Sequence, residues 1–358
     1  MLKSGIPRFI IFALPGLGDI VNFLPALESL FKAYPLGRFD VLVMFRSTYE
    51  IMKAYPQINE VIFADFMNMS KIESALFALK LRRKHYDISI MSYPANRIEY
   101  NILSFLVGAK IRIAHKYKHF TYVNLPFLNN RLIEQTEALH NVQENMRLLV
   151  PLGLNPKDPK HLVFPLKEED EEFADRFIRE AGIETRYPIF GIHAFSTTFK
   201  NMHRKCWDAE NFARLIDNLA ENYNSAAFLL FGSKIDETAN NYIMEHTKHK
   251  PILATNLPIT KTAAIIKKCN LFITNDSGLM HIASAMRVKT VALFGPTNPA
   301  WLHPWGTDYK IVRVDLPCSP CFYYSQKPLN CKRKEKDYLC MKAITVEMVA
   351  NACTELLG

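Results

Sequence analysis

Short apolar runs typical of buried strands alternate with longer segments of helical character along this chain of 358 residues. In the first half the strand-like runs are Arg8 to Leu14, Phe39 to Phe45, Val61 to Phe63 and Asp87 to Ser92. The helical segments between them are Ile20 to Tyr34, Arg46 to Ala54 and Lys71 to His85. Because strands that alternate with helices pair through crossover connections, the pattern predicts an α/β fold with a parallel sheet.

The second half repeats this pattern, which predicts a second unit of the same kind. Its expected strands are Ile189 to Ala194, Ala226 to Phe231, Leu271 to Thr274 and Thr290 to Phe294, and its expected helices are Asp208 to Tyr223 and Gly278 to Met286. The segment Pro151 to Lys167 between the halves is rich in Pro and Lys, which is typical of a domain boundary. We therefore expect one domain over residues 1–165 and another over residues 166–358.

Composition narrows the class of protein. Hydrophobic residues make up 49% of the chain, too many for a disordered protein. No run approaches the ~18–20 apolar residues of a membrane span, and no cleavage site follows the first apolar run, so we expect a cytoplasmic protein. The 44 basic and 35 acidic residues leave a formal charge of +9, which favours an anionic partner such as a phosphorylated ligand, an acidic membrane or nucleic acid.

The first strand runs into a glycine turn, Gly16-Leu17-Gly18-Asp19, and then into a helix. Backbone N–H groups at such a helix start can bind an anion. The dinucleotide fingerprint requires a third glycine where Val21 stands, so the sequence argues against NAD binding. Asp19 would lie at the carboxyl edge of the sheet, where ligands bind in open α/β folds. Taken alone, Asp19 fits a helix cap as well as a catalytic carboxylate.

Polar residues also follow two later strands. The run Thr274-Asn275-Asp276-Ser277-Gly278-Leu279-Met280-His281 joins a strand to a helix, and Phe294-Gly295-Pro296-Thr297-Asn298-Pro299 follows the next strand. Backbone N–H groups of Ser277 and Gly278 could hold a diphosphate at the helix N-terminus. The alternative is a capped helix whose His281 is a buried core residue.

These residues carry a resemblance to a known family. Asn275 to Ala285 followed by Val291 to Pro299 resembles the signature of the lipopolysaccharide heptosyltransferases, glycosyltransferase family 9, and Gly18-Asp19, Leu24 to Leu27 and Tyr34-Pro35 are similar to its N-terminal block. The resemblance implies a GT-B fold, two Rossmann-like domains that face each other across a cleft. It implies a nucleotide-sugar donor held mainly by the C-terminal domain and an acceptor held by the N-terminal domain.

The family pattern of paired threonines followed by Lys-x-Trp is present as Thr197-Thr198 and Lys205-Cys206-Trp207. The stretch between them is longer than usual, so Lys200 or Arg204 could take the place of Lys205. Lys200, His203, Arg204 and Lys205 form a cationic cluster suited to a diphosphate, although a solvated basic loop would look the same. The resemblance implies Asp19 and Lys205 as catalytic residues. The expected donor-binding residues are Gly18, Thr197, Thr198, Lys200, Arg204, Asp276, Ser277, Gly278, His281 and Pro296.

Four cysteines lie close together near the C-terminus: Cys318, Cys321, Cys331 and Cys340. A C-x2-C pair with two further cysteines in a basic loop fits a structural zinc or iron site with four thiolates. The alternatives are reduced thiols or a disulfide from Cys318 to a distant partner. Disulfides are disfavoured in the cytosol.

The sequence thus predicts an inverting glycosyltransferase, with ADP-heptose as the expected donor and a lipopolysaccharide core or related lipid-linked glycan as the acceptor. No Asp-x-Asp pair occurs, so catalysis demands no metal cofactor. Basic residues crowd the N-terminal half and suggest peripheral contact with an anionic membrane: Lys71, Lys80, Arg82, Arg83, Lys84, His85, Arg97, Lys110 and Arg112. A nucleotide-sugar epimerase on the same fold is the alternative. A nucleic-acid-binding protein with a cysteine finger fits less well, because the basic residues are dispersed and no RNA-module signature occurs.

Overall fold

The computed structural model describes residues 5–119, 123–324 and 327–358, and the chain divides into two compact units. Unit 1 contains Met1–Pro159 together with Tyr324–Gln326, and unit 2 contains Lys160–Tyr323 and Lys327–Gly358. The chain therefore leaves unit 1 after Pro159, a few residues before the boundary expected from the sequence, and a short segment near the C-terminus belongs to unit 1 again.

Unit 1 is built on a parallel six-stranded sheet with the order β3-β2-β1-β4-β5-β6. Every residue of β1 after Arg8 is buried, as expected for a central strand covered on both faces. The strands are β1 (Arg8–Ala13), β2 (Arg38–Val43), β3 (Ile58–Phe63), β4 (Ile88–Met91), β5 (Ile111–Lys116) and β6 (Arg131–Glu134).

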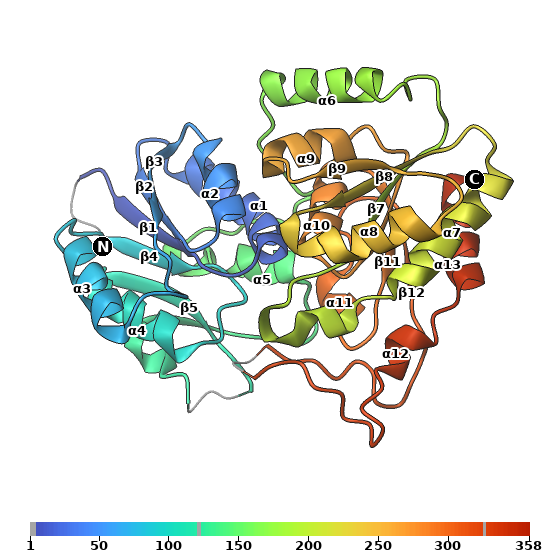
Figure 1. Ribbon diagram of the computed structural model, residues 1–358. Helices are drawn as coiled ribbons and strands as arrows, with labels where there is room; N and C mark the ends of the chain where they lie inside the picture. The colour runs from blue at the N-terminus through green and yellow to red at the C-terminus, as the bar shows by residue number, and fades with distance from the viewer. Residues whose placement is uncertain (1–4, 120–122, 325–326) are drawn as a thin grey trace. The chain divides into compact units, whose positions relative to one another are not determined.

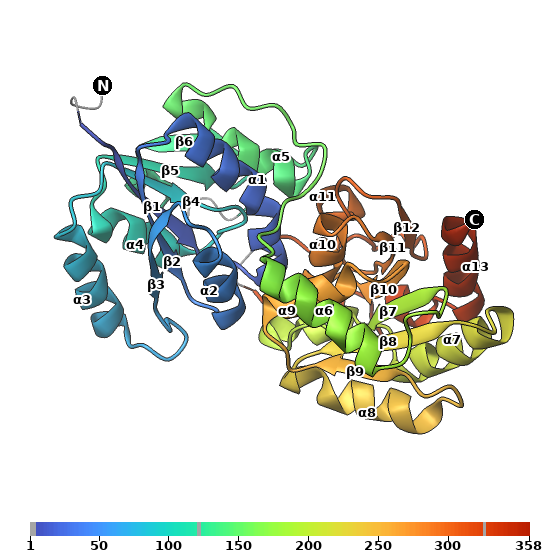
Figure 2. The same ribbon diagram turned by 90° about the horizontal axis from the view of Figure 1, so that it is seen from above.

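Helices cover both faces of this sheet (Figure 2), with α3 and α4 packed together on one face and α1 packed against α5 on the other. A capping box between Ser70 and Glu73 starts α3, and Gly108 in the left-handed region ends α4. The helices are α1 (Leu17–Ala33), α2 (Arg46–Lys53), α3 (Lys71–Arg82), α4 (Ile98–Val107) and α5 (Asn141–Arg147), with 3-10 turns η1 (Pro126–Leu128) and η2 (Val150–Leu152).

Unit 2 has a second parallel six-stranded sheet, with the order β12-β11-β10-β7-β8-β9. Its central strands β7, β10 and β11 are almost entirely buried. The strands are β7 (Ile189–His193), β8 (Ala227–Gly232), β9 (Ile252–Thr255), β10 (Leu271–Asn275), β11 (Lys289–Leu293) and β12 (Tyr309–Val312).

On one face of this sheet, α7 packs against α8 and α13 over a core that contains Phe190, Trp207, Phe212 and Val349 (Figure 1). On the other face α9 and α10 cover the strands, and α6 packs on α9. The helices are α6 (Glu168–Glu180), α7 (Ala209–Asn222), α8 (Glu237–His246), α9 (Ile259–Ile266), α10 (Gly278–Ala285), α11 (Pro299–Leu302), α12 (Leu339–Lys342) and α13 (Val346–Leu357), with 3-10 turns η3 (Phe199–Lys205) and η4 (Lys234–Asp236).

Both sheets reverse their strand order next to the first strand, between β1 and β4 in unit 1 and between β7 and β10 in unit 2. Ligands of open α/β sheets bind outside the carboxyl ends of the strands at such switch points. Asp19 follows β1, and the segments 194–205 and 276–281 follow β7 and β10.

The predicted fold is confirmed, with two parallel α/β units of Rossmann type. Within residues 5–119, 123–324 and 327–358, no helix is both long enough and apolar enough to cross a bilayer.

Candidate active site

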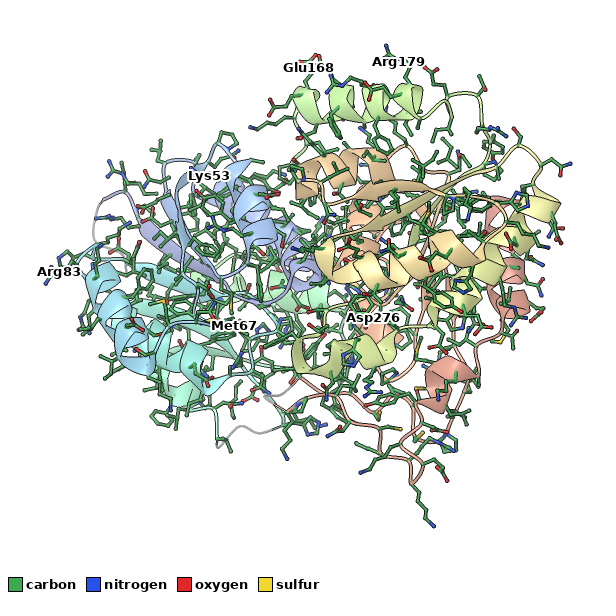
Figure 3. All side chains as sticks on the ribbon, in the orientation of Figure 1. Lys53, Met67, Arg83, Glu168, Arg179 and Asp276 are labelled. Carbon is green, nitrogen blue, oxygen red and sulfur yellow. The ribbon has the colours of Figure 1, made fainter. Side chains whose placement is uncertain are left out.

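A buried ion pair joins two of the predicted site residues in unit 2. Lys205, at the end of η3, places its Nζ 2.6 Å from Oδ2 of Asp276, directly after β10. Only 9% of Lys205 and 3% of Asp276 is exposed. Beside the pair, the backbone N–H of Trp207 donates to Oδ1 of Asn275, so the loop after β7 is fastened to the loop after β10. Of Lys200, Arg204 and Lys205, it is Lys205 whose ammonium pairs with Asp276. Asp276 is labelled in Figure 3.

The start of α10 lies in the same place and is anchored by a histidine that the sequence analysis missed. Ser277 is the N-cap residue, and its Oγ lies 2.9 Å from Nδ1 of His193, the last residue of β7. Nε2 of His193 lies 3.1 Å from Oδ1 of Asp236. Burial alone would raise the pKa of Asp236, but hydrogen bonds from His193 and Ser233 lower it. His193 thus links the Asp236 carboxylate to the Ser277 hydroxyl through its two ring nitrogens.

This network turns the Ser277 side chain inward. The backbone N–H groups at the start of α10, among them those of Ser277 and Gly278, have no partner within the helix. They carry the partial positive charge of the helix dipole. A phosphate oxygen is a fitting ligand for such groups.

Several buried polar atoms around these loops have no hydrogen-bond partner in the described part of the chain: Nδ2 of Asn275, Nδ1 of His281, Oγ1 of Thr297 and Nδ1 of His203. Buried polar groups are nearly always satisfied, so orphaned atoms on adjoining loops are expected where a ligand supplies the partners. Burial lowers the pKa of His281 to about 4, so its imidazole is neutral near pH 7.

The other residues predicted for unit 2 lie on the same loops but have different surroundings. Thr197 and Thr198 are exposed, and Oγ1 of Thr197 accepts from the N–H of Phe199. The ammonium of Lys200 lies over the Phe199 ring, and the guanidinium of Arg204 lies over the Tyr338 ring.

Asp19 and Gly18 lie on α1, so they belong to unit 1 and not to the loops of unit 2. Gly16 is the N-cap residue of α1 and Asp19 is the third residue of the helix, so Asp19 lies in the first turn and is not the N-cap residue itself. Asn22, one turn further along, is fully buried, and neither polar atom of its amide has a partner in the described part of the chain.

Unit 1 also contains a group of buried tyrosines and a buried ionic cluster. Burial raises the pKa of Tyr93, Tyr100 and Tyr117, and the negative charge of Asp19 adds to this increase. The rings of Tyr93 and Tyr117 stack at 5.7 Å.

His115, beside Tyr93, is buried, and its Nε2 lies 3.0 Å from Oε2 of Glu144, which Arg147 also contacts at 2.7 Å. Burial lowers the pKa of His115, whereas the pKa of Glu144 is lowered by hydrogen bonds that outweigh its burial. The pair is therefore a neutral imidazole and a carboxylate. Nothing in the local sequence pattern pointed to these residues, because their association depends on long-range pairing.

The four clustered cysteines line one small cavity in unit 2, together with Pro296, Leu329, Lys332 and Tyr338. All seven cysteines of the chain are free thiols, so the disulfide alternative is not observed. Burial, together with the other three cysteines of the cavity, raises the pKa of Cys340 to about 11. As they stand, no three Cys, His, Asp or Glu side chains in the described ranges are arranged to hold one metal ion.

The segment that carries these cysteines braces the loops after β7 and β11. Oγ of Ser319 donates to the carbonyl of Gly295 at 2.6 Å, and the N–H groups of Cys321 and Phe322 both donate to the carbonyl of Pro296 at 2.9 Å. On the other side, the N–H of Leu329 donates to the carbonyl of Lys200 at 2.9 Å. Pro296 thus interacts with the cysteine segment through its backbone.

Lys200 and its neighbour Asn201 both have left-handed backbone conformations, with φ values of 52° and 60°. Side chains rarely adopt this conformation without support from their surroundings.

Two parallel sheets with a switch point each, and a helix that starts beside one of them, are the architecture of proteins built from two Rossmann-type units, which bind nucleotides at such points. The sequence profile of glycosyltransferase family 9 (heptosyltransferase) matches residues 75–332. The chain belongs to this family, and it is accordingly a glycosyltransferase that uses a nucleotide-sugar donor.

Relatives and solved structures agree with this assignment. The chain is 29% identical over 352 residues to lipooligosaccharide heptosyltransferase 2 of Campylobacter jejuni, with 95% of each chain covered. In fold it resembles a family 9 glycosyl transferase from Veillonella parvula, with a TM-score of 0.77, 24% identity and coverage of 99% and 98%. It also resembles the ADP-heptose lipopolysaccharide heptosyltransferase II of E. coli, with a TM-score of 0.70, 20% identity and 98% of each chain covered.

Proposed function

We propose that the chain transfers heptose from ADP-heptose to the core of a lipopolysaccharide, or to a related surface glycan, with inversion at the anomeric carbon. The proposal is supported by the heptosyltransferase relatives together with the buried Lys205–Asp276 pair beside the start of α10. In this proposal unit 2 holds the donor and unit 1 holds the acceptor. An epimerase has no support from the family assignment.

On the donor side, the residues of unit 2 bind and neutralise the diphosphate. Backbone N–H groups of Ser277 and Gly278 donate to phosphate oxygens, while Lys205 supplies a buried positive charge. The threonines Thr197 and Thr198 supply hydroxyl donors from the loop after β7. Because these groups are fixed before the reaction, they stabilise the negative charge that develops on the leaving diphosphate.

On the acceptor side, Asp19 acts as the general base. The acceptor hydroxyl oxygen bonds to the anomeric carbon on the face opposite the nucleotide, its proton passes to the Asp19 carboxylate, and the bond between the anomeric carbon and the diphosphate oxygen breaks. The products are the glycosylated acceptor and ADP. General base catalysis of this kind contributes about 10²–10⁴-fold to a rate.

The test replaces Asp19 with Asn and measures ADP release with and without acceptor. We expect D19N to lose about 10²–10⁴-fold in transfer while its affinity for ADP, measured by titration calorimetry, is unchanged. Asp65→Asn removes another carboxylate of unit 1 and is the matched control. Near-normal turnover in D19N would remove Asp19 from this role, and weaker ADP binding in D19N would place it on the donor side instead.

We also propose that the four cysteines, whose side chains line one cavity, bind a structural zinc or iron ion and lose their protons when they do so. The convergence of Cys318, Cys321, Cys331 and Cys340 supports this, and Lys332 offers a compensating charge. The thiols would have to move closer together around the ion. Four thiolates leave no open coordination position, so the ion would stabilise the segment without taking part in transfer.

Elemental analysis of protein purified without chelators tests the metal proposal. We expect about one equivalent of metal, lost in Cys321→Ser and retained in the control Cys353→Ser. No metal together with four titratable thiols in this segment would refute it.

A lipid-linked acceptor requires the enzyme to work at a membrane. We propose that the chain acts in the cytoplasm and contacts the inner face of the cytoplasmic membrane, attracted by the basic residues of unit 1. Cell fractionation should recover it partly with membranes at low salt. Recovery only in the supernatant at low salt would contradict this location.

A further inference from the structure

The helix α3 presents apolar side chains on the face that points away from the core. Ile72 is 73% exposed, Leu76 is 62% exposed and Leu79 is 43% exposed. Their spacing of four and three residues aligns them along one side of the helix. Ala78 and Leu81, on the opposite side, pack into the core of unit 1. Apolar side chains thus occupy both sides of α3, which is unusual for a helix that faces water.

The neighbouring elements α4 and η1 also expose large apolar side chains. The helix α4 lies beside α3 in both ribbon views and packs against it, and it exposes Ile102 and Phe105. The turn η1 contacts α4 and exposes Phe127, at 71%. We call these six side chains the α3–α4 ridge: Ile72, Leu76, Leu79, Ile102, Phe105 and Phe127. A cluster of large apolar side chains on one surface marks an interaction site.

Cations accompany the ridge. Lys80 and Arg83 are exposed near the end of α3, and Figure 3 shows Arg83 at the outer edge of unit 1. The guanidinium of Arg82 lies beside Gly108 at the end of α4, and that of Arg112 lies over the Phe105 ring at 5.7 Å.

Two acidic side chains belong to the same helices. Glu73 bonds to Ser70 in the capping box and keeps its negative charge, whereas Glu99 pairs with Arg97. Other basic residues of this half are also neutralised, Lys84 by Asp40 and Glu60, and Lys110 by Asp87. The positive charge beside the ridge is that of Lys80, Arg82, Arg83 and Arg112.

We propose that the α3–α4 ridge is a membrane-binding face that inserts its apolar side chains among the headgroups of an anionic bilayer. This proposal rests on the proposed function. It adds which surface of the enzyme contacts the membrane that holds the lipid-linked acceptor. An anionic bilayer satisfies both features at once, because apolar side chains reach the acyl boundary while Lys and Arg remain at the phosphates. A protein partner is a poorer match, since charged residues are depleted from the centres of protein interfaces.

Binding of the full chain to vesicles tests the proposal. We compare phosphatidylcholine vesicles with vesicles that also contain phosphatidylglycerol, by co-sedimentation at low and high salt. Leu76→Ser combined with Phe105→Ser should weaken binding to the anionic vesicles by about tenfold or more at either salt concentration. Lys80→Gln combined with Arg83→Gln should weaken it by about 30-fold at low salt and less at high salt.

Matched control variants carry the same types of substitution at exposed positions outside the ridge. Leu253→Ser with Met348→Ser removes exposed apolar side chains, and Lys157→Gln with Lys248→Gln removes exposed cations. Both controls should bind vesicles as the wild type does.

Three outcomes would overturn the proposal. They are equal binding to neutral vesicles, unchanged binding by the Leu76/Phe105 variant, and a wild-type dimer that this variant dissociates, which would make the ridge an interface between copies. ADP affinity by calorimetry is measured on every variant. A wild type that binds vesicles but not ADP would refute the proposed function and leave the ridge intact.

Discussion

The buried pair of Lys205 and Asp276 yields a prediction about stability that can be worked out from its geometry. Both side chains are almost inaccessible to water and their charged atoms are 2.6 Å apart. Each charge therefore compensates the other for the hydration that it loses on burial. Removing one partner of such a pair leaves an uncompensated buried charge, which costs about 3–5 kcal/mol. Lys205→Met and Asp276→Asn should therefore each destabilise the enzyme, although neither residue lies in a hydrophobic core.

A double-mutant cycle measures the coupling free energy between Lys205 and Asp276. The variant that carries both substitutions has no buried unpaired charge, so we expect it to be more stable than Lys205→Met by about 2 kcal/mol or more. At about 2–4 °C per kcal/mol for a unit of this size, each single variant should melt roughly 6–20 °C lower than the wild type. Differential scanning calorimetry in the absence of nucleotide measures all four proteins.

The exposed pair of Lys310 and Glu355 is the matched control, because its charged atoms are 2.7 Å apart but both side chains are in water. Its coupling should be about 0–1 kcal/mol. If the double variant of Lys205 and Asp276 is no more stable than the single ones, or if both pairs couple equally, the buried ion pair is refuted. Because the Lys205 variant is expected to melt at a lower temperature, its affinity for ADP must be measured at a temperature at which the variant is folded.

Two further predictions concern stability. His281 has a folded pKa of about 4, below its unfolded value near ~6.5, so the folded state binds fewer protons between these values. The contribution of His281 to the free energy of unfolding is fully present above about pH 6.5. As the pH falls below this value, the free energy of unfolding decreases by up to about 1.4 kcal/mol per pH unit. His281→Gln should make the melting temperature less dependent on pH between about pH 7 and about pH 5, whereas the exposed control His249→Gln should leave this dependence unchanged. Equal pH dependence of the melting temperature in the two variants would contradict the buried neutral state of His281. Gly306→Ala should destabilise by about 2 kcal/mol or more, because a Cβ there would lie 2.3 Å from the Lys160 carbonyl oxygen. Gly153→Ala, at a similar φ but in open space, should cost only about 1 kcal/mol, and equal melting temperatures for the two would refute the steric argument.

The sequence predicts the elements that carry the site more reliably than the contacts within it. Strand β10, the start of α10 and the loop after β11 follow from a buried apolar run that ends in small polar residues, which is a local signal. The position of Asp19 just after the first strand follows in the same way.

The pairing of Lys205 with Asp276, and of His193 with Ser277, joins residues about 70 and 84 positions apart, so no local pattern contains it. The one available signal for His193 was a titratable residue at the carboxyl end of an otherwise apolar strand. Edge strands β6, β9 and β12 were also not predicted, because they are short and partly exposed and lack a continuous apolar run.

The conformation of the loop after β7 depends on a residue far away in the chain, because the N–H of Leu329 donates a hydrogen bond to the carbonyl of Lys200. Two successive non-glycine residues in the left-handed region cost about 1–3 kcal/mol each, and the hydrogen bond from the Leu329 N–H helps to hold them there. If this loop holds the donor, as we propose, alkylation of a thiol in the cysteine segment should change the affinity for ADP without contact with the nucleotide. An inhibitor bound in the cysteine cavity would then act at a distance from the nucleotide and would not need to compete with ADP.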